Sequence, residues 1–99
     1  MDPLKIFATL ESSLTADQLL AHLRTCGWSG NEHAYSLHRA DCWLQLEYSG
    51  DGLYSIHGEI SRTDDLEKQL QPLIEDLRQG HLHLDVFEED GRLVKRVQI

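Results

Sequence analysis

The chain has 99 residues, of which 40% are apolar and 26% charged, and 17 acidic against 9 basic side chains give a formal charge of −8. These values are typical of a single globular domain, 1–99, with a core of modest depth. They argue against nucleic acid and anionic membrane as partners, because both are bound through cationic side chains.

No export or membrane segment is expected. The N-terminal apolar run is short, and Asp2 stands where a signal peptide carries basic residues. No apolar stretch approaches the roughly 18 residues of a membrane span. Cys26 and Cys42 form no C-x-x-C pair. We therefore expect a cytoplasmic protein with reduced thiols.

The first half of the chain predicts a strand, a helix and two strands, at residues 4–10, 14–27, 34–39 and 42–48. The strands alternate apolar and polar side chains, which is the pattern of a half-buried strand. Thr15 and Gln18 form a capping box at the start of the helix, and Gly27 supplies the left-handed residue that ends it. Trp28 is expected to fold over the edge of the core.

The second half predicts the same layout, with a strand at 53–60, a helix at 63–80 and strands at 81–89 and 92–99. We expect Thr63 to cap this helix and Gly80 to end it. Pro72 should kink the helix, and the alternative is a break within residues 68–71.

Two turns fix the strand registers. A three-residue loop, Gly50-Asp51-Gly52, pairs Tyr48 with Tyr54 and keeps all apolar side chains on one face, whereas a two-residue loop would turn one apolar set outward. Asp90-Gly91 is a good two-residue hairpin turn. It predicts the pairs Leu82–Ile99, Leu84–Val97, Asp85–Arg96 and Glu89–Arg92.

The element order β-α-β-β-β-α-β-β divides into two β-α-β-β halves that are similar in layout but share few residue identities. Both helices and most strands have one apolar face. This pattern favours an α+β fold, in which an antiparallel sheet of about six strands carries both helices on one face.

The stretch HLHLD, His81 to Asp85, has the spacing of some metal sites. Asp85 is expected opposite Arg96, a cation that would compete with a metal, and Val86 stands where a further histidine would continue the motif. We interpret the stretch as a surface strand. The alternative function is a small-ligand or metal-binding regulatory domain that uses His57, His81 and His83.

Two H-x3-C pairs, His22 with Cys26 and His38 with Cys42, offer ligands that zinc prefers. Both cysteines fall on predicted apolar faces, however, and free cysteine is commonly buried as a small hydrophobe. We predict neither a metal site nor a cofactor.

Catalysis has little support, because the chain contains no G-x-S-x-G, no G-x-x-x-x-G-K-[ST] and no H-E-x-x-H motif. His57 and Glu59 share the outer face of one strand and are the pair that acid–base chemistry would use. No nucleophile is placed beside them, so an acid–base enzyme is the third and last hypothesis.

The sheet face turned away from the helices is the main candidate site. Aromatic side chains mixed with histidines and carboxylates resemble the centre of a protein interface. A homodimer contact or closure of the sheet into a small barrel would explain the same face. The predicted binding residues are Phe7, Trp43, His57, Glu59, His83 and Phe87.

We therefore predict a small, acidic, non-catalytic protein-binding domain of bacterial type. Its size, its acidity and its lack of motifs fit an inhibitor of the immunity or antitoxin kind. The negative charge would favour a basic partner protein, because complementary charge steers association.

Overall fold

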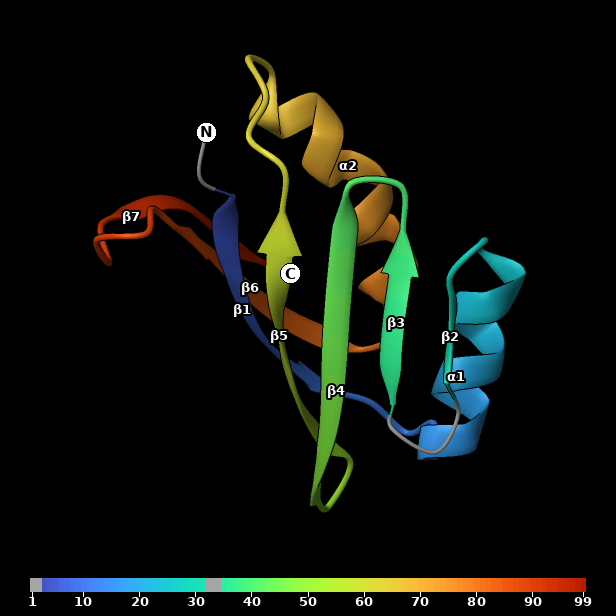
Figure 1. The fold of residues 1–99 in the computed structure, drawn as a ribbon. Helices are drawn as coiled ribbons and strands as arrows, with labels where there is room; N and C mark the ends of the chain where they lie inside the picture. Colours follow the sequence, from blue (N-terminus) through green and yellow to red (C-terminus); the bar gives the residue numbers. More distant parts are fainter. Residues whose placement is uncertain (1–2, 32–34) are drawn as a thin grey trace.

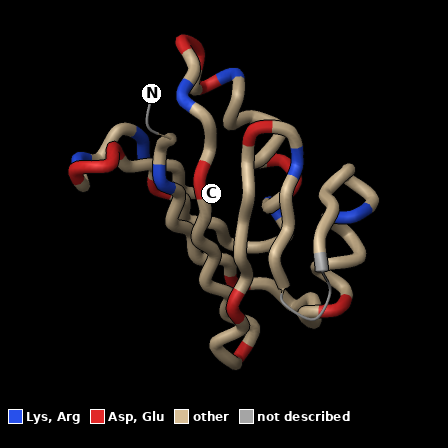
Figure 2. Tube along the Cα trace, viewed as in Figure 1, with Lys and Arg blue, Asp and Glu red and all other residues tan. Residues whose placement is uncertain are grey.

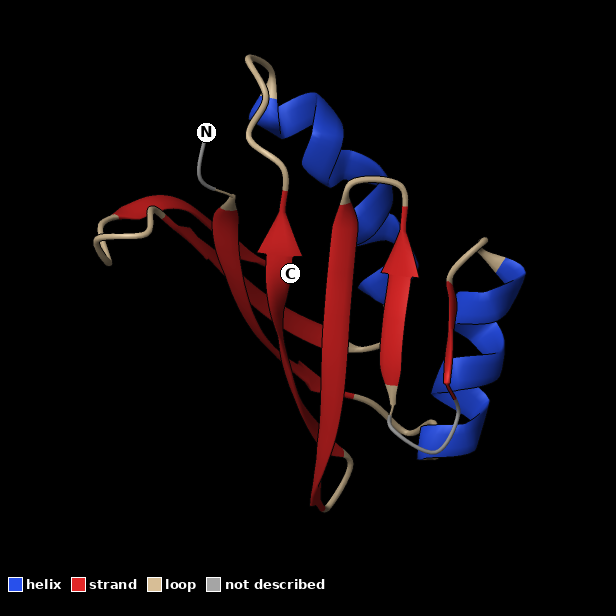
Figure 3. Ribbon diagram, viewed as in Figure 1, coloured by secondary structure: helices blue, strands red, loops and turns tan. Residues whose placement is uncertain are grey.

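The computed structural model describes residues 3–31 and 35–99 and shows one antiparallel sheet with two helices on one side (Figures 1 and 3). The elements are β1 Leu4–Glu11, α1 Ala16–Thr25, β2 Ser29–Asn31, β3 Ser36–Arg39, β4 Cys42–Gly50, β5 Leu53–Ile60, α2 Leu66–Leu77, β6 His81–Phe87 and β7 Leu93–Gln98. The predicted α+β class and the placement of both helices are confirmed. Sequence analysis missed only the short strand β2.

The seven strands form one sheet in the spatial order β2-β3-β4-β5-β1-β6-β7. The first strand of the chain, β1, lies at the centre and pairs with β5 and β6. After α1 the chain adds strands from the edge inward, whereas after α2 it adds them outward. The two halves therefore differ in strand arrangement, and β2 gives the first half one strand more than the second. Among the described strands the order ends at β2 and β7, so the sheet is open and the closed-barrel alternative is wrong.

The core lies between the helices and one face of the sheet. Each central strand contributes every second side chain, including Leu4, Ile6, Ala8 and Leu10 of β1 and Leu82, Leu84 and Val86 of β6. The helices bury Leu19, Leu20 and Leu23 of α1 and Leu70, Leu73 and Leu77 of α2. The helical spacing of these leucines explains why both helices pack against the same face.

The start of α1 is as predicted. The Gln18 amide donates to the Thr15 hydroxyl over 3.2 Å, and the Gln18 side chain accepts from the Thr15 amide over 2.9 Å. This reciprocal pair satisfies two backbone donors that the first turn of a helix leaves open.

The predicted ends of the second helix are wrong. Asp65, not Thr63, caps α2 by accepting from the Lys68 amide over 3.1 Å, because Asp65 directly precedes the first residue of the helix. The helix continues through Pro72, so no break occurs before it, and it ends at Leu77. Gly80 does not end the helix. Glycine is needed there because a Cβ atom would lie 1.9 Å from the backbone oxygen of Glu11, so only a residue without a side chain can pack this close to β1.

The predicted pairing of Tyr48 with Tyr54 is confirmed, but the loop is shorter than expected. Gly50 pairs with Leu53, which leaves a two-residue turn, and a β-bulge between Tyr48 and Gly50 restores the register. The bulge contributes the extra residue that keeps apolar side chains on one face.

In the last hairpin Asp85 faces Arg96 as predicted, and Leu82 and Ile99 exchange backbone hydrogen bonds. The predicted pair of Glu89 with Arg92 is wrong, because the register shifts between Val86 and Phe87. The Glu88 amide donates to the Arg92 carbonyl instead, over 2.8 Å.

No helix in the described part of the chain is long and apolar enough to span a membrane. Acidic residues are spread over loops, strands and helices rather than gathered in one patch (Figure 2). The negative charge is therefore not concentrated at one end of the molecule.

Candidate functional site on the outer sheet face

The outer face is the side of the sheet away from α1 and α2. Pairing sets Phe7 between His57 of β5 and Asp85 of β6, and it sets Trp43 of β4 beside Glu59 of β5. Odd-numbered residues of the four central strands share this face, because side chains alternate along a strand. All six residues predicted for binding lie on it, namely Phe7, Trp43, His57, Glu59, His83 and Phe87.

Aromatic side chains form two edge-to-face pairs here. The rings of Phe7 and Phe87 have centroids 5.7 Å apart at 72°, and those of Trp43 and His57 are 6.2 Å apart at 84°. Such geometry is favoured between aromatic rings. Phe7 is nevertheless 54% exposed and Trp43 41% exposed. Within each pair, one ring packs against the edge or face of the other. Phe7 and Trp43 still present apolar surface to solvent.

The central charges of the outer face are neutralised within the chain. Lys5 donates from Nζ to Oε1 of Glu59 over 2.8 Å. Arg96 binds Asp85 through two hydrogen bonds, of 2.9 and 3.3 Å. The carboxylate of Glu59 is thus bound by Lys5, and the structure gives no hydrogen bond between Glu59 and His57, the pair considered for acid–base chemistry.

His83 is held at both ring nitrogens. Nε2 lies 3.2 Å from Oδ1 of Asp85, and Nδ1 lies 2.9 Å from Nε2 of Gln98. A carboxylate only accepts, so Nε2 carries the proton and Nδ1 accepts from the Gln98 amide. A metal ion at His83 would have to displace one of these partners. Within residues 3–31 and 35–99, no three His, Cys, Asp or Glu side chains are placed to hold a metal.

The environment of Asp85 stabilises its charged form. Hydrogen bonds from Arg96, and to a smaller extent from His83, hold the pKa of Asp85 below its usual value, although desolvation opposes them. Asp85 therefore stays ionised and remains paired with Arg96.

Two shallow hollows flank Phe7. One, of about 260 Å³, brings His57 and His83 together with Asp85, while His81 does not line it. The other, of about 450 Å³, lies beside Phe87 and the acidic residue Glu88. Phe7 thus separates two shallow depressions of the outer face. A surface with two protrusions would be complementary in shape.

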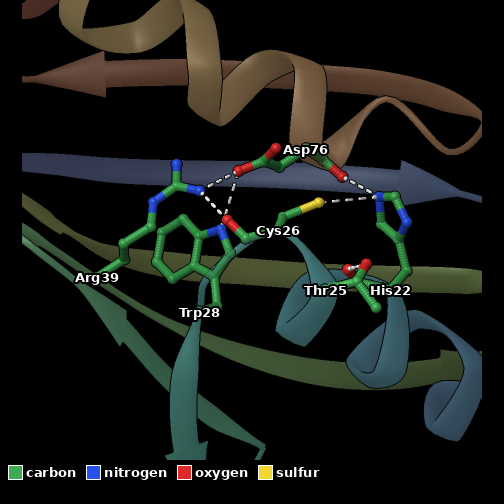
Figure 4. A network of polar contacts seen from close by, with 6 residues as sticks. All are labelled: His22, Thr25, Cys26, Trp28, Arg39 and Asp76. Atoms are coloured by element: carbon green, nitrogen blue, oxygen red, sulfur yellow. Dashed lines mark hydrogen bonds and ion pairs between the residues drawn. The ribbon is translucent and has the colours of Figure 1, made fainter.

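A second group of polar side chains, which the sequence did not predict, joins the helices on the opposite side of the sheet (Figure 4). Asp76 of α2 accepts from Nε1 of Trp28 over 3.0 Å and from Nη1 of Arg39 over 2.5 Å. The Arg39 guanidinium lies 4.5 Å from the centroid of the Trp28 ring, a cation–π contact. We call Trp28, Arg39 and Asp76 the inner network.

The thiol beside the inner network is not activated. His22 Nε2 lies 3.1 Å from the Asp76 carbonyl and 3.7 Å from Sγ of Cys26. Because a carbonyl only accepts, Nε2 carries a proton and cannot remove the one on Cys26. Burial, more than the nearby Asp76, raises the pKa of Cys26. This group stabilises the contact between α1 and α2.

The structure also excludes the zinc site considered for the two H-x3-C pairs. His38 is exposed opposite Trp43 on the outer face, whereas Cys42 lies opposite buried Ile60 on the inner face. Residues that point to opposite faces of a sheet cannot share one tetrahedral ion.

The outer face thus combines exposed aromatic rings, paired charges and two shallow hollows. No protein-family model matches the chain, and no curated protein or solved structure is significantly similar to it.

Proposed function

We propose that this chain is a small, non-catalytic protein-binding domain whose partner docks on the outer face of the sheet. The observation that carries the proposal is the exposure of Phe7 and Trp43 on a sheet face that neither helix covers. Large aromatic side chains at the centre of an interface contribute most of its binding energy. Their edge-to-face partners also hold them in place, which lowers the entropy lost on binding.

Charge supports a basic partner. The chain carries 17 acidic and 9 basic residues, and Lys5 and Arg96 on the outer face are already paired with carboxylates. A basic surface would therefore be attracted over long range and would meet the aromatic centre on contact. An immunity or antitoxin-like inhibitor of a basic bacterial protein is the role that fits best. Both cysteines are free, which suits a cytoplasmic location.

The test is partner capture by a doubly substituted protein. Trp43→Ala together with Phe87→Ala, with the fold verified by circular dichroism, should abolish partner capture from a lysate of the source cells. Interface hot spots cost about 2 kcal/mol or more each, so the double variant should bind at least about a thousandfold more weakly. Unchanged capture would refute the proposal.

The matched control is Ile99→Ala. Ile99 is 40% exposed, but its pairing with buried Leu82 through backbone hydrogen bonds sets it on the helix side of the sheet. This variant should capture the partner as wild type does. Sedimentation of wild type and double variant separates the homodimer alternative: a dimer that the double substitution dissociates would assign the face to a second copy.

A small-ligand role is the second candidate, and the hollow shared by His57, His83 and Asp85 is the observation that favours it. Thermal shift with excess zinc or nickel tests its metal-binding form, because a ligand that binds the native state raises its stability. Since both nitrogens of His83 are engaged, we expect no stabilisation. A clear rise in melting temperature, lost in His83→Ala, would support the metal-binding role instead.

A further inference from the structure

All three tyrosines of the chain, at positions 35, 48 and 54, line one small cavity. The other lining residues are Ala16, the first residue of α1, and Leu46 of β4. Ala16 begins α1, and Tyr48 and Tyr54 flank the turn between β4 and β5. Figure 1 shows both elements at the same end of the molecule. It is on the helix side of the sheet and is separate from the outer face. We call it the tyrosine cavity.

The rings of this cavity are held in place. Tyr48 and Tyr54 are cross-strand neighbours with ring centroids 5.0 Å apart and planes 50° apart. The hydroxyl of Tyr54 donates to the Leu14 carbonyl over 2.6 Å, and that of Tyr48 accepts from the Gly52 amide over 3.2 Å. The two hydroxyls are therefore engaged with backbone, and the π faces are what these residues offer to a ligand.

The environment keeps Tyr54 neutral. Burial first, and then the neighbouring phenols of Tyr48 and Tyr35, raise the pKa of Tyr54. The protonated hydroxyl can continue to donate to Leu14. The influence of both other phenols on Tyr54 also agrees with the convergence of the three rings.

Tyr35 reaches the cavity from a backbone conformation that is costly for its residue type. Its φ is 50°, in the left-handed region that bulky side chains rarely adopt. The Leu46 amide donates to the Tyr35 carbonyl over 3.0 Å and holds that conformation. Such strain clusters at functional sites, and here it accompanies a third aromatic wall.

We propose that the tyrosine cavity binds a trimethylammonium group. The cavity measures about 140 Å³, room for roughly five groups of water size at about 30 Å³ each, and a quaternary nitrogen with its methyl groups has that size. Aromatic faces attract such a cation through the ring quadrupole, which a neutral group of the same shape lacks. The charge of −8 on the chain raises the local concentration of cations.

One side of the cavity is accessible. Tyr54 is 1% exposed and forms its base, whereas Tyr48 is 55% exposed and stands at its mouth. A trimethylammonium group carried on a chain can therefore enter while the chain stays in solvent. The group can come from a free small molecule such as choline or from a trimethylated lysine in a peptide.

The experiment titrates the intact protein with choline and follows the amide and aromatic resonances by NMR. The neutral control is 3,3-dimethylbutan-1-ol, in which carbon replaces the quaternary nitrogen. Choline should bind with a dissociation constant of roughly 1 mM, shift the resonances of the three tyrosines, and show ring-current shifts of its own methyl protons. The neutral alcohol should bind at least about fivefold more weakly.

Variants separate the site from a merely structural role. Tyr48→Leu keeps an apolar side chain at the exposed mouth and should weaken choline binding at least about fivefold, while Tyr48→Phe keeps the ring and should stay within about twofold of wild type. Trp43→Leu removes an exposed aromatic from the outer face and should leave choline binding unchanged. The fold of each variant is checked by its amide spectrum.

A capped peptide with trimethyllysine distinguishes the two sources. Binding at least about tenfold tighter than that of choline would place the cation on a protein, and equal or weaker binding would place it on a small molecule; both results support the site. Three results would overturn it: no saturable shift with choline up to about 20 mM, equal binding of the neutral alcohol, or full choline binding by Tyr48→Leu.

Discussion

Asp76 joins three segments of the chain, and its replacement by alanine tests how much the inner network contributes to stability. The side chain of Asp76 is 15% exposed and that of Arg39 is 27% exposed. Asp76→Ala would leave Nε1 of Trp28 without its acceptor. Nη1 of Arg39 would lose its ionic partner but would keep the hydrogen bond that it donates to the Cys26 carbonyl over 2.8 Å. Trp28 is 3% exposed, so its indole N–H would find little access to water.

The magnitude follows from these contacts. A hydrogen bond to a charged group contributes about 1.5–3 kcal/mol, and removing one partner of a fully buried ion pair costs about 3–5 kcal/mol. Arg39 is partly exposed and can regain hydration, which reduces the cost. We expect Asp76→Ala to lower the free energy of unfolding by about 2 kcal/mol, which corresponds to a fall in melting temperature of roughly 8–16 °C for a domain of this length.

Urea unfolding followed by tryptophan fluorescence and far-UV circular dichroism measures this difference. Asp76→Asn keeps an acceptor and loses only the charge, so it should cost about 1 kcal/mol. Glu75→Ala removes an exposed carboxylate from the same helix and should stay within about 0.5 kcal/mol of wild type. A loss below that limit for Asp76→Ala would refute the assignment of a stabilising role to the inner network.

Two further predictions concern titrating groups. Because Arg96 lowers the pKa of Asp85 in the folded state, the stability gained from this pair is fully present above the unfolded pKa and is lost as the pH falls through the lowered folded pKa. The difference in unfolding free energy between wild type and Arg96→Gln should therefore be constant above about pH 5 and shrink at lower pH; a difference that grows on acidification would contradict the assignment. Burial raises the pKa of Cys42 to about 12, and it also raises that of Cys26, so both thiols should react with iodoacetamide at pH 8 far more slowly than free glutathione. Rapid alkylation of the folded protein would show that burial does not suppress the reactivity of these thiols.

Sequence analysis predicted the elements whose signals are local and repeated. The alternation along 4–10 and 53–60 and the capping box at Thr15 identified two strands and the start of α1. The alternation of side chains along each strand also predicts all six candidate residues on the outer face, where the strand pairing places them. The register survived even where the turn differed, because a bulge next to Gly50 compensated for a shorter loop.

Other features depend on contacts that no short stretch encodes. The strand β2 contains Ser29 and Gly30, which carry no apolar pattern, and it forms only because β3 supplies an edge. Three consecutive residues, Thr63 to Asp65, are of types that favour the N-cap position of a helix. Asp65 is the one that caps α2, because tertiary packing rather than local preference sets where the helix begins.

The inner network and the tyrosine cavity lay beyond prediction for a related reason. Trp28, Arg39 and Asp76 come from three separate segments, and their meeting depends on how α2 crosses the sheet. The alternation of side chains along the strands predicts that Tyr48 lies beside Tyr54. Tyr35 joins them only through a left-handed backbone conformation. Tyrosine rarely adopts that conformation, so the sequence gives no reason to expect it.

The central position of β1 has a consequence for the order of folding. Both of its neighbours, β5 and β6, come from the second half of the chain, and the nearer of them begins at Leu53. During synthesis β1 therefore emerges long before any strand that it pairs with, and contacts of such large sequence separation form slowly. Until β5 follows, both edges of this apolar strand lack partners, so the early chain is the stage at which aggregation or chaperone binding is most expected.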